Sequence, residues 1–331
     1  MRVTVLGAGS WGTTVATLAA ARNPTVLWAR RDDLARTIDK THENPAYLPG
    51  FGLPPSLRAT SDLEEAVSAA ELLVVGVPSH GVRAVLEEAR PWVHPWIPIV
   101  SLTKGFEDGT LLRMTQVIQE VLPGRPAAAL TGPNLAREIL SGYAAAGVIA
   151  TQDMAVARAI QGVLRRPMFR VYTNHDVIGA EVGGALKNVI AIATGIAQGL
   201  SVGDNTRAAV ISRGLAELTR LGVAMGAEER TFAGLAGMGD LIATCMSPLS
   251  RNRQVGERLG RGERIEDILA GMHMVAEGVR TATTASGLAE RYHLEMPICN
   301  EVRRVLAGEQ TGEEAYRGLL HVRAGHESEP W

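Results

Sequence analysis

The stretch Val3-Thr4-Val5-Leu6-Gly7-Ala8-Gly9-Ser10-Trp11-Gly12 joins a short apolar run to an alanine-rich segment with helical spacing. This order predicts a buried strand, a glycine-rich turn and a helix. Gly7 would allow the tight turn, Gly9 would let the backbone approach a phosphate, and Gly12 would let the helix lie close to the strand. The unpaired N–H groups at the start of the helix would then point at the phosphates of a dinucleotide.

A second apolar run at residues 25–29 completes a strand–helix–strand unit of the expected length. In NAD-specific folds an acidic residue at the end of this second strand binds the ribose 2′-hydroxyl. Here Arg30 and Arg31 occupy that place, and two guanidinium groups suit a 2′-phosphate. NADP(H) is therefore the favoured cofactor. Asp32 and Asp33 follow directly, so use of NAD(H) stays open, and a solvated charged run is the alternative interpretation.

The composition excludes several classes of protein. The chain has 331 residues, 46% hydrophobic and 21% charged, with a net charge of −2. These values describe a folded protein of about two domains and favour neither nucleic acid nor an anionic membrane as partner. Cys245 and Cys299 are far apart and show no metal-ligand spacing, which predicts a reducing compartment and no metal site. The first strand begins at Arg2 or Val3, leaving no room for a signal peptide, and the apolar segment 188–202 is short for a membrane span. We expect a cytoplasmic protein without membrane insertion.

The pattern along the chain predicts an α/β fold, a Rossmann-type doubly wound sheet domain followed by an all-α domain. In residues 1–175, short apolar runs alternate with helical stretches, as in a parallel sheet covered on both faces. Ser61-Asp62-Leu63-Glu64 and Asp153 would each start a helix. Residues 176–331 carry helical spacing instead, and we expect the last thirty or so to be frayed. The expected strands are 3–6, 25–29, 72–77, 97–102, 127–130, 145–150 and 169–173, and the clearest later helices are 207–225, 264–274 and 279–292.

Three of the expected strands end in polar or turn-forming residues, at 78–80, 103–105 and 131–134. In doubly wound sheets ligands bind beyond the carboxyl ends of the strands, so these ends should converge. Lys104 is the one cation among them and is a candidate for orienting an anionic or carbonyl substrate. An exposed loop lysine is the alternative. We assign His80 to packing or capping, and the proline-punctuated loop 44–50 to a connector.

Lys187 lies among glycines and aliphatic residues in segment 181–192. Partial desolvation there would lower its pKa from about 10.4 toward the working range. Such a lysine can protonate the alkoxide that forms when a hydride adds to a ketone, and can act as the base in the reverse direction. A lysine that snorkels from the end of a buried helix is the alternative.

Two features later in the chain, Asp240 and the segment 250–253, are candidates for contacting a substrate. Asp240 follows a glycine-rich segment that lacks the dinucleotide order of glycines, and it could simply be the N-cap of a helix. Ser250-Arg251-Asn252-Arg253 gathers a hydroxyl, an amide and two guanidinium groups, which is what a substrate phosphate needs. A basic solvated loop is the alternative for this second feature.

Taken together, these residues resemble the bacterial NAD(P)-dependent sn-glycerol-3-phosphate dehydrogenases, which interconvert dihydroxyacetone phosphate and sn-glycerol 3-phosphate. The resemblance covers most of the chain. It is carried in order by segments 7–12, 44–50, 102–106, 130–133, 181–188, 234–245, 249–252 and 277–280.

The resemblance implies that Lys187 is the proton acceptor in glycerol phosphate oxidation and that Lys104 touches both cofactor and substrate. It also implies a homodimer and a role in glycerophospholipid synthesis. The family usually has serine where this chain has Asn134, although an amide can still donate to a phosphate. The implied substrate contacts are Lys104, Gly132, Asn134, Lys187, Asp240, Ser250, Arg251 and Asn252. The implied cofactor contacts are Gly7, Gly9, Ser10, Trp11, Gly12, Arg30, Arg31, Lys104, Ala136, Arg251, Val275 and Glu277.

We therefore expect an NAD(P)H-dependent dehydrogenase that acts on a small-molecule substrate, with Lys187 as general acid and base. Two other functions compete with this one. A 3-hydroxyacid dehydrogenase would share a Rossmann domain, a helical domain and a catalytic lysine, and Ser250-Arg251-Asn252 discriminates against it only weakly. A redox sensor would bind NADPH without turnover.

Overall fold

The structure is a computed structural model that describes residues 1–272 and 276–320. It divides into two compact units, the first formed by Met1–Thr103 and Leu112–Val177, the second by Lys104–Leu111 and Ile178–Trp331. The sequence had suggested a division after residue 175. The short segment Lys104–Leu111 belongs with the second unit because Phe106, only 2% exposed, is part of the helical core there.

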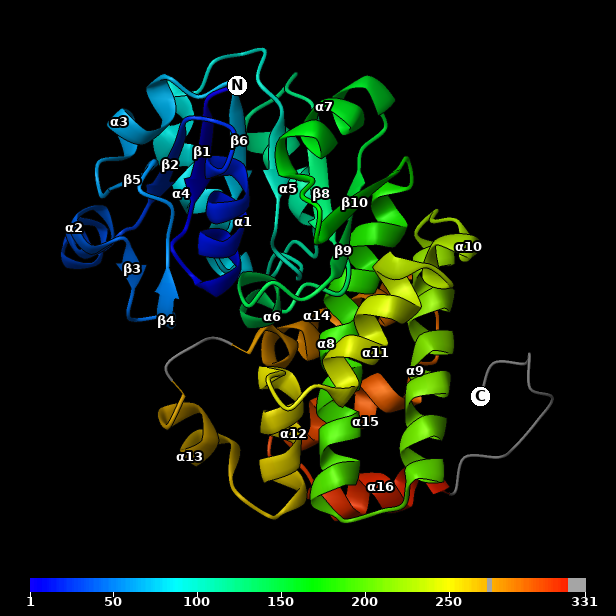
Figure 1. Cartoon of the computed structure of the whole chain (residues 1–331). Helices are drawn as coiled ribbons and strands as arrows, with labels where there is room; N and C mark the ends of the chain where they lie inside the picture. Colours follow the sequence, from blue (N-terminus) through cyan, green and yellow to red (C-terminus); the bar gives the residue numbers. More distant parts are fainter. Residues whose placement is uncertain (273–275, 321–331) are drawn as a thin grey trace. The chain divides into compact units, whose positions relative to one another are not determined.

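The first unit contains an eight-stranded sheet in the order β10-β9-β8-β7-β6-β1-β2-β5 (Figure 1). All seven predicted strands are present, and β5 is an addition whose alternating residues gave no apolar run. The expected parallel sheet has one exception: β9 pairs antiparallel with β8, and only the five-residue helix α6 (Ala136–Leu140) lies between them. The strands are β1 (Val3–Leu6), β2 (Thr25–Trp28), β5 (Leu57–Thr60), β6 (Leu72–Val75), β7 (Ile99–Ser101), β8 (Ala127–Thr131), β9 (Ala145–Ala150) and β10 (Phe169–Asn174).

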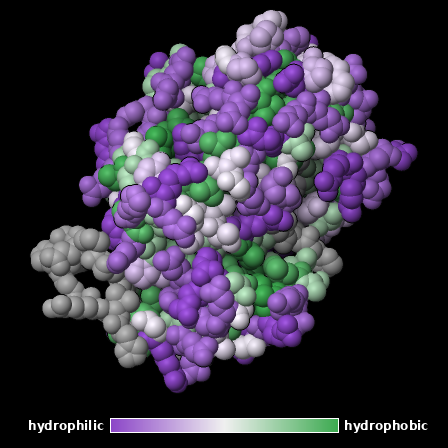
Figure 2. All heavy atoms as spheres, turned by 180° about the vertical axis from the view of Figure 1, so that it is seen from behind, coloured by the Kyte–Doolittle hydropathy of each residue, from purple (hydrophilic) through white to green (hydrophobic). Residues whose placement is uncertain are grey.

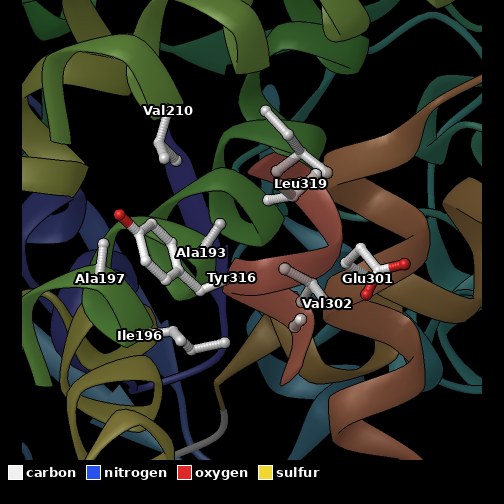
Figure 3. A pocket seen from close by; sticks show the side chains of 10 residues that line it. Ala193, Ile196, Ala197, Val210, Glu301, Val302, Tyr316 and Leu319 are labelled. Carbon is white, nitrogen blue, oxygen red and sulfur yellow. The ribbon is translucent and has the colours of Figure 1, made fainter. Parts of the chain in front are cut away.

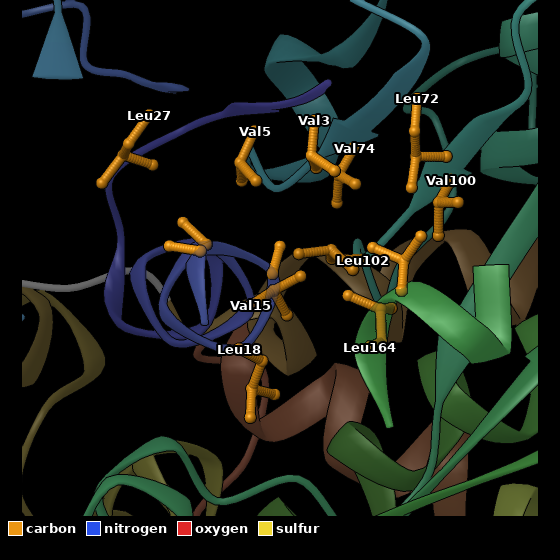
Figure 4. Close-up of a cluster of buried hydrophobic side chains, with 14 of the residues drawn as sticks. Val3, Val5, Val15, Leu18, Leu27, Leu72, Val74, Val100, Leu102 and Leu164 are labelled. Carbon is orange, nitrogen blue, oxygen red and sulfur yellow. The ribbon is translucent and has the colours of Figure 1, made fainter. Parts of the chain in front are cut away.

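Helices cover both faces of this sheet. Successive residues of β6 point to opposite faces, so Leu72 and Val74 pack in one core and Leu73 and Val75 in the other. Figure 4 shows the first of these cores, where the strand residues meet Val15 and Leu18 of α1. The helices are α1 (Ser10–Ala20), α2 (Asp32–Thr41), α3 (Leu63–Ser68), η1 (Ser79–Gly81), α4 (Val82–Ala89), η2 (Arg90–Trp92), α5 (Met114–Val121), α6 (Ala136–Leu140) and α7 (Met154–Leu164).

Two predicted helix starts are confirmed. Asp62 caps α3 by accepting from the Glu65 N–H at 3.0 Å, so the cap is Asp62 and not Ser61. Asp153 caps α7 in the same way. A small hairpin of β3 (Glu43–Asn44) and β4 (Leu48–Gly52) replaces the simple connector that was expected at 44–50.

The second unit is helical. Its elements are α8 (Val177–Gly199), α9 (Asp204–Ala224), α10 (Glu229–Phe232), η3 (Leu235–Gly239), α11 (Asp240–Met246), α12 (Arg251–Gly260), α13 (Ile265–Ala270), α14 (Glu277–Arg291), α15 (Pro297–Leu306) and α16 (Gly312–Leu320). The helix expected at 264–274 is thus shorter. The expectation of a frayed end at the last thirty residues was wrong up to Leu320, because the amphipathic α16 buries Ala315 in the core. Residues 321–331 lie outside the described part.

Helix α8 is the central element of the second unit. It has 23 residues, more than the apolar segment predicted from the sequence, and a mean hydropathy of 1.4, so by length and composition it could cross a membrane. However, 89% of its apolar window is buried within the protein, as in the core helix of a helical domain. The surface in Figure 2 is mainly hydrophilic, with hydrophobic side chains gathered in a few patches.

Candidate active site

The glycine-rich turn of the first unit has the geometry of a dinucleotide cradle. Gly7 has a φ of +112°, and a Cβ there would lie 2.7 Å from the Gly76 carbonyl oxygen. A Cβ on Gly12 would overlap the Gly7 carbonyl oxygen, so α1 lies directly against the turn. A Cβ on Gly9, in contrast, would meet nothing within 4 Å. Gly9 is also the N-cap of α1 and supplies no side-chain cap, so the start of the helix fits a pyrophosphate.

Arg30 and Arg31 are both exposed just beyond β2. Both carboxylates that follow have partners, and the partner of Asp33 is Arg31 itself. Asp33 lies 3.7 Å from the Arg31 guanidinium, and Asp32 accepts from the Ser61 hydroxyl at 2.9 Å and pairs with Arg36. This arrangement favours an anionic group over a neutral ribose hydroxyl at this position.

The turn after β8 carries three of the expected contacts. Gly132 has a φ of +112° and lies close to the β9 backbone. A Cβ added at this position would lie only 3.2 Å from the Ala146 carbonyl oxygen. Ala136 is the first residue of α6. Both amide atoms of Asn134 are buried and have no hydrogen-bond partner among the described residues. Because buried amides are normally paired, Asn134 is a candidate for binding a ligand.

In the second unit, α8 places Lys187 against the first turn of α11. The Lys187 ammonium donates to Oδ1 of Asp240 and to Oγ1 of Thr244, the latter at 2.6 Å. Lys187 is 5% exposed and Asp240 only 1%. The N-cap of α11 is Gly239, so the Asp240 carboxylate does not cap the helix and is committed to lysine.

Burial lowers the pKa of Lys187 from 10.5 to about 7. The Asp240 carboxylate opposes this shift, and the nearby Lys104 ammonium reinforces it. Lys187 therefore exchanges its proton near neutral pH. Arginine could not do so, because its guanidinium stays protonated in proteins.

Lys104 completes this cluster. Its ammonium lies 2.7 Å from Oδ2 of Asp240, so one carboxylate holds two ammonium groups, one on each oxygen. The chain has 33 basic residues, and only Lys40, Lys104 and Lys187 among them are lysine. Two of the three lysines thus meet on one buried aspartate, and the scarcity of lysine in the sequence is a signal that could have linked them.

Two polar residues of this region were not predicted. Asn188 donates to the Lys104 carbonyl oxygen at 3.1 Å and accepts from the Asn252 amide at 2.9 Å. Thr244 accepts from Lys187 and donates to the Asp240 carbonyl oxygen at 2.7 Å. The signals were available in the sequence, since Asn188 follows Lys187 and Thr244 lies one helical turn after Asp240.

The segment at the start of α12 holds three of the expected substrate contacts, and two of them also make hydrogen bonds within the fold. Ser250 is the N-cap of α12 and accepts from the Arg253 N–H at 3.3 Å. Arg253 pairs with Glu257 at 3.0 Å, and Asn252 accepts from the Gly278 N–H at 3.0 Å. Arg251 is exposed at the first position of the helix. Arg251, which interacts electrostatically with Glu277, remains a candidate for binding an anion.

The remaining predicted residues are placed as follows. Ser10 and Trp11 form the first turn of α1, and the Trp11 indole N–H is buried without a partner among the described residues. Glu277 is the first residue of α14. His80 is exposed in η1. Val275 lies outside the described residues. No group of three potential metal ligands occurs within residues 1–272 and 276–320.

A small pocket in the second unit does not belong to this site. Figure 3 shows Tyr316, Val302 and Leu319 around it, and its volume is about 30 Å³. This is room for about one water molecule. Its lining from α8, α9, α15 and α16 is mainly aliphatic and contains neither lysine of the cluster.

Comparison with known proteins agrees with this geometry. A family model described as the NAD-dependent glycerol-3-phosphate dehydrogenase N-terminus matches residues 2–157, and the corresponding C-terminus model matches residues 176–317. The chain is 55% identical over 330 residues to glycerol-3-phosphate dehydrogenase [NAD(P)+] 2 of Sphingopyxis alaskensis, covering 100% of this chain and 99% of the relative. It is 53% identical to glycerol-3-phosphate dehydrogenase [NAD(P)+] of Mycobacterium avium, covering 98% of this chain and 96% of that one.

Among solved structures, the glycerol-3-phosphate dehydrogenase of Coxiella burnetii is similar with a TM-score of 0.93 and 34% identity, covering 97% of this chain and 98% of that one. Both family models, the curated relatives and this structure agree over nearly the full length. The chain therefore belongs to the NAD-dependent glycerol-3-phosphate dehydrogenase family.

Proposed function

We propose that this protein is an NAD(P)-dependent glycerol-3-phosphate dehydrogenase that reduces dihydroxyacetone phosphate reversibly to sn-glycerol 3-phosphate. The observation that carries the chemistry is the buried Lys187 held on Asp240 and Thr244, with a pKa of about 7. The names of the relatives supply the substrate, and the fold alone would not.

The first unit would hold the cofactor through the glycine-rich turn of Gly7, Gly9 and Gly12. Ser10, Trp11 and Ala136 would add contacts, and Arg30 and Arg31 would bind the 2′-phosphate of NADPH. From the second unit, Lys104, Arg251, Glu277 and Val275 are the proposed cofactor contacts. NADP(H) is favoured because Arg30 and Arg31 are exposed just beyond β2 and Asp32 is bonded to Ser61 and Arg36. The relatives are named for NAD(P)+ and leave NAD(H) as a second cofactor. When bound, the nicotinamide supplies the hydride.

The substrate phosphate would be held by Arg251 with Ser250 and Asn252, and the carbonyl end by Lys104, Lys187 and Asp240. Gly132 and Asn134 are the proposed contacts from the first unit. Lys187 in its ammonium form donates a proton to the oxygen that becomes the alcohol. In the oxidative direction, neutral Lys187 accepts that proton. Asp240 keeps both lysines in place and balances their charge while the proton leaves and returns.

The first experiment follows NADPH absorbance after addition of dihydroxyacetone phosphate, for wild type, Lys187→Ala and Lys187→Met. We expect turnover by wild type and a loss of at least about 10³-fold in both variants, because each lacks the proton donor. Lys40→Met is the matched control, since Lys40 is exposed in the last turn of α2 and should keep full activity.

The pH profile tests the same assignment in both directions. Reduction needs the protonated lysine, so its kcat should fall as pH rises through about 7, whereas oxidation should lose kcat as pH falls through about 7. NADPH binding by wild type without any turnover would favour a redox sensor. Turnover with a hydroxyacid but not with the triose phosphate would favour a hydroxyacid dehydrogenase.

We further propose a cytoplasmic homodimer that neither inserts into a membrane nor binds nucleic acid, and whose product enters glycerophospholipid synthesis. The net charge of −2 argues against nucleic-acid binding, and the burial of α8 argues against membrane insertion. Light scattering of the purified protein measures the oligomeric state, and a monomer at micromolar concentration would contradict the dimer.

A further inference from the structure

The hairpin β3–β4 is fastened to the glycine-rich turn by a buried side chain. Asn44 is 0% exposed, and its amide group donates to the Ala8 carbonyl oxygen at 2.8 Å and to Oγ1 of Thr13 at 2.9 Å. Its Oδ1 accepts from the Tyr47 N–H at 3.2 Å. Three hydrogen bonds thus hold one asparagine, and two of them reach the turn and the first helix.

The hairpin also holds the other side of the turn. The Ser10 hydroxyl donates to the Tyr47 carbonyl oxygen at 3.0 Å, and the Tyr47 ring packs against the core that includes α1. Leu48, 0% exposed, anchors the start of β4. The residues on both sides of Gly9 are therefore bonded to one hairpin, whose strands are labelled β3 and β4 in Figure 1.

The bond to Ala8 has a consequence for Gly9. Ala8 O and Gly9 N belong to one planar trans peptide, in which the C=O and the N–H point in opposite directions. Because Asn44 holds the Ala8 carbonyl toward the hairpin, it turns the Gly9 N–H away from the hairpin. A Cβ added at Gly9 would have no neighbouring atom within 4 Å, so there is open space beside this residue.

We propose that Asn44 is a positioning residue for the cofactor: by fixing the peptide between Ala8 and Gly9, it presents the Gly9 N–H to a dinucleotide phosphate. This inference rests on the cofactor site proposed above. Preorganised backbone donors bind an anion more tightly because no ordering is needed on binding. Asn44 itself does not touch the cofactor in this proposal.

The test uses Asn44→Asp, which keeps the size and the acceptor for Tyr47. The substitution replaces the amide nitrogen that donates to the Ala8 carbonyl with a carboxylate oxygen. Both groups are then acceptors, so this hydrogen bond is lost. The matched control is Asn23→Asp, because Asn23 donates to the Ala19 carbonyl oxygen at 3.2 Å at the opposite end of α1.

We expect Asn44→Asp to raise the Kd for NADPH, measured by calorimetry, about tenfold or more. The KM for NADPH should rise in parallel, while kcat at saturating NADPH and the KM for the triose phosphate stay within about twofold. Amide hydrogen exchange of residues 7–14 in the ligand-free protein should accelerate. Asn23→Asp should leave the Kd and this exchange within about twofold of wild type.

A second variant covers the case in which Asn44→Asp does not fold. Thr13→Val keeps the shape and removes one of the two acceptors, so the Kd should rise about threefold with a folded protein. Equal Kd values for wild type, Asn44→Asp and Thr13→Val, with unchanged exchange, would overturn the inference alone. Failure of wild type to bind NADPH would overturn the cofactor site and the inference with it.

Discussion

Lys187 and Glu217 are two buried ionisable residues of the helical unit, and burial moves the pKa of each to about 7. Lys187 comes down from 10.5 and Glu217 rises from 4.5, because burial disfavours the charged form of both. By pKa alone the two residues are equivalent candidates for acid–base chemistry. Their hydrogen-bond partners separate them.

Glu217 serves the fold. From α9 its two oxygens accept from the Ile298 N–H at 2.7 Å and the Cys299 N–H at 3.1 Å, at the start of α15. The first position of that helix is Pro297, which has no N–H, and the N-cap residue supplies no side-chain cap. The carboxyl group thus satisfies the first free N–H groups of α15 from a neighbouring helix.

Lys187 has partners of another kind. It lies on a charged aspartate that also holds Lys104, so its proton is part of a cluster of side chains whose charges respond to one another. The comparison teaches that a shifted pKa identifies burial, and that the partners decide whether the group is structural or chemical.

Among the changes that test this comparison, removal of the Asp240 charge beside Lys187 has the largest expected effect. Asp240→Asn keeps the shape but leaves two ammonium groups without their carboxylate, so kcat/KM should fall about 10²- to 10³-fold. The pKa of Lys187 should fall further, because Asp240 is the group that raises it. Steady-state kinetics against pH measures both changes.

Asp267→Asn is the matched control for this variant. Asp267 is exposed in the first turn of α13, and its substitution should leave kcat/KM within about twofold. If Asp240→Asn keeps nearly full activity, the aspartate is only structural. The partners of Lys187 would then no longer distinguish it from Glu217.

The second prediction concerns stability and should spare activity. Glu217 holds its proton up to pH 7 in the folded state but only up to about 4.5 when unfolded, so its contribution to the free energy of unfolding decreases as pH rises between these values. The decrease is roughly 3 kcal/mol. Glu217→Gln removes this dependence.

Urea unfolding of wild type and Glu217→Gln from pH 5 to pH 8 measures this difference. The stability of wild type relative to the variant should fall from pH 5 to about pH 7 and level off above it, because Glu217 is then ionised in both states. The kcat/KM at pH 7 should agree within about twofold. A flat difference would mean that Glu217 is ionised throughout. A large loss of activity with intact stability would make Glu217 part of the chemistry.

The local patterns in the sequence predicted the first unit well. Strand, turn and helix at residues 3–20 follow from apolar runs and glycine sterics, which act over a few residues. The antiparallel direction of β9 escaped prediction because an apolar run does not record the direction of its strand. The hairpin at Asn44 escaped prediction because it is fastened by side-chain bonds to Ala8 and Thr13, which lie 36 and 31 residues earlier. The same limit applies to the site: Lys187 and Asp240 were named separately, but their bond joins positions 53 residues apart.

The smallest expected effect sharpens the comparison at Lys187 itself. Because the chain has three lysines, labelling with ε-¹³C-lysine gives three NMR signals, and Lys187→Met identifies one of them. That signal should titrate near pH 7. In Thr244→Val it should titrate about half a unit lower, since the hydroxyl that accepts from the ammonium at 2.6 Å stabilises the charged form.

Thr219→Val is the control for this shift. Like Thr244, Thr219 donates from its hydroxyl to the carbonyl oxygen one turn earlier in its helix, here that of Leu215 in α9 at 2.7 Å. It should leave the lysine titration unchanged. If the signal of Lys187 instead titrates near 10.5, burial does not lower its pKa. Only Glu217 would then have a pKa shifted by burial, and the comparison between the two residues would fail. If the signal titrates near 7 and shifts in Thr244→Val but not in Thr219→Val, then the side chains around the ammonium adjust the pKa that burial has already lowered.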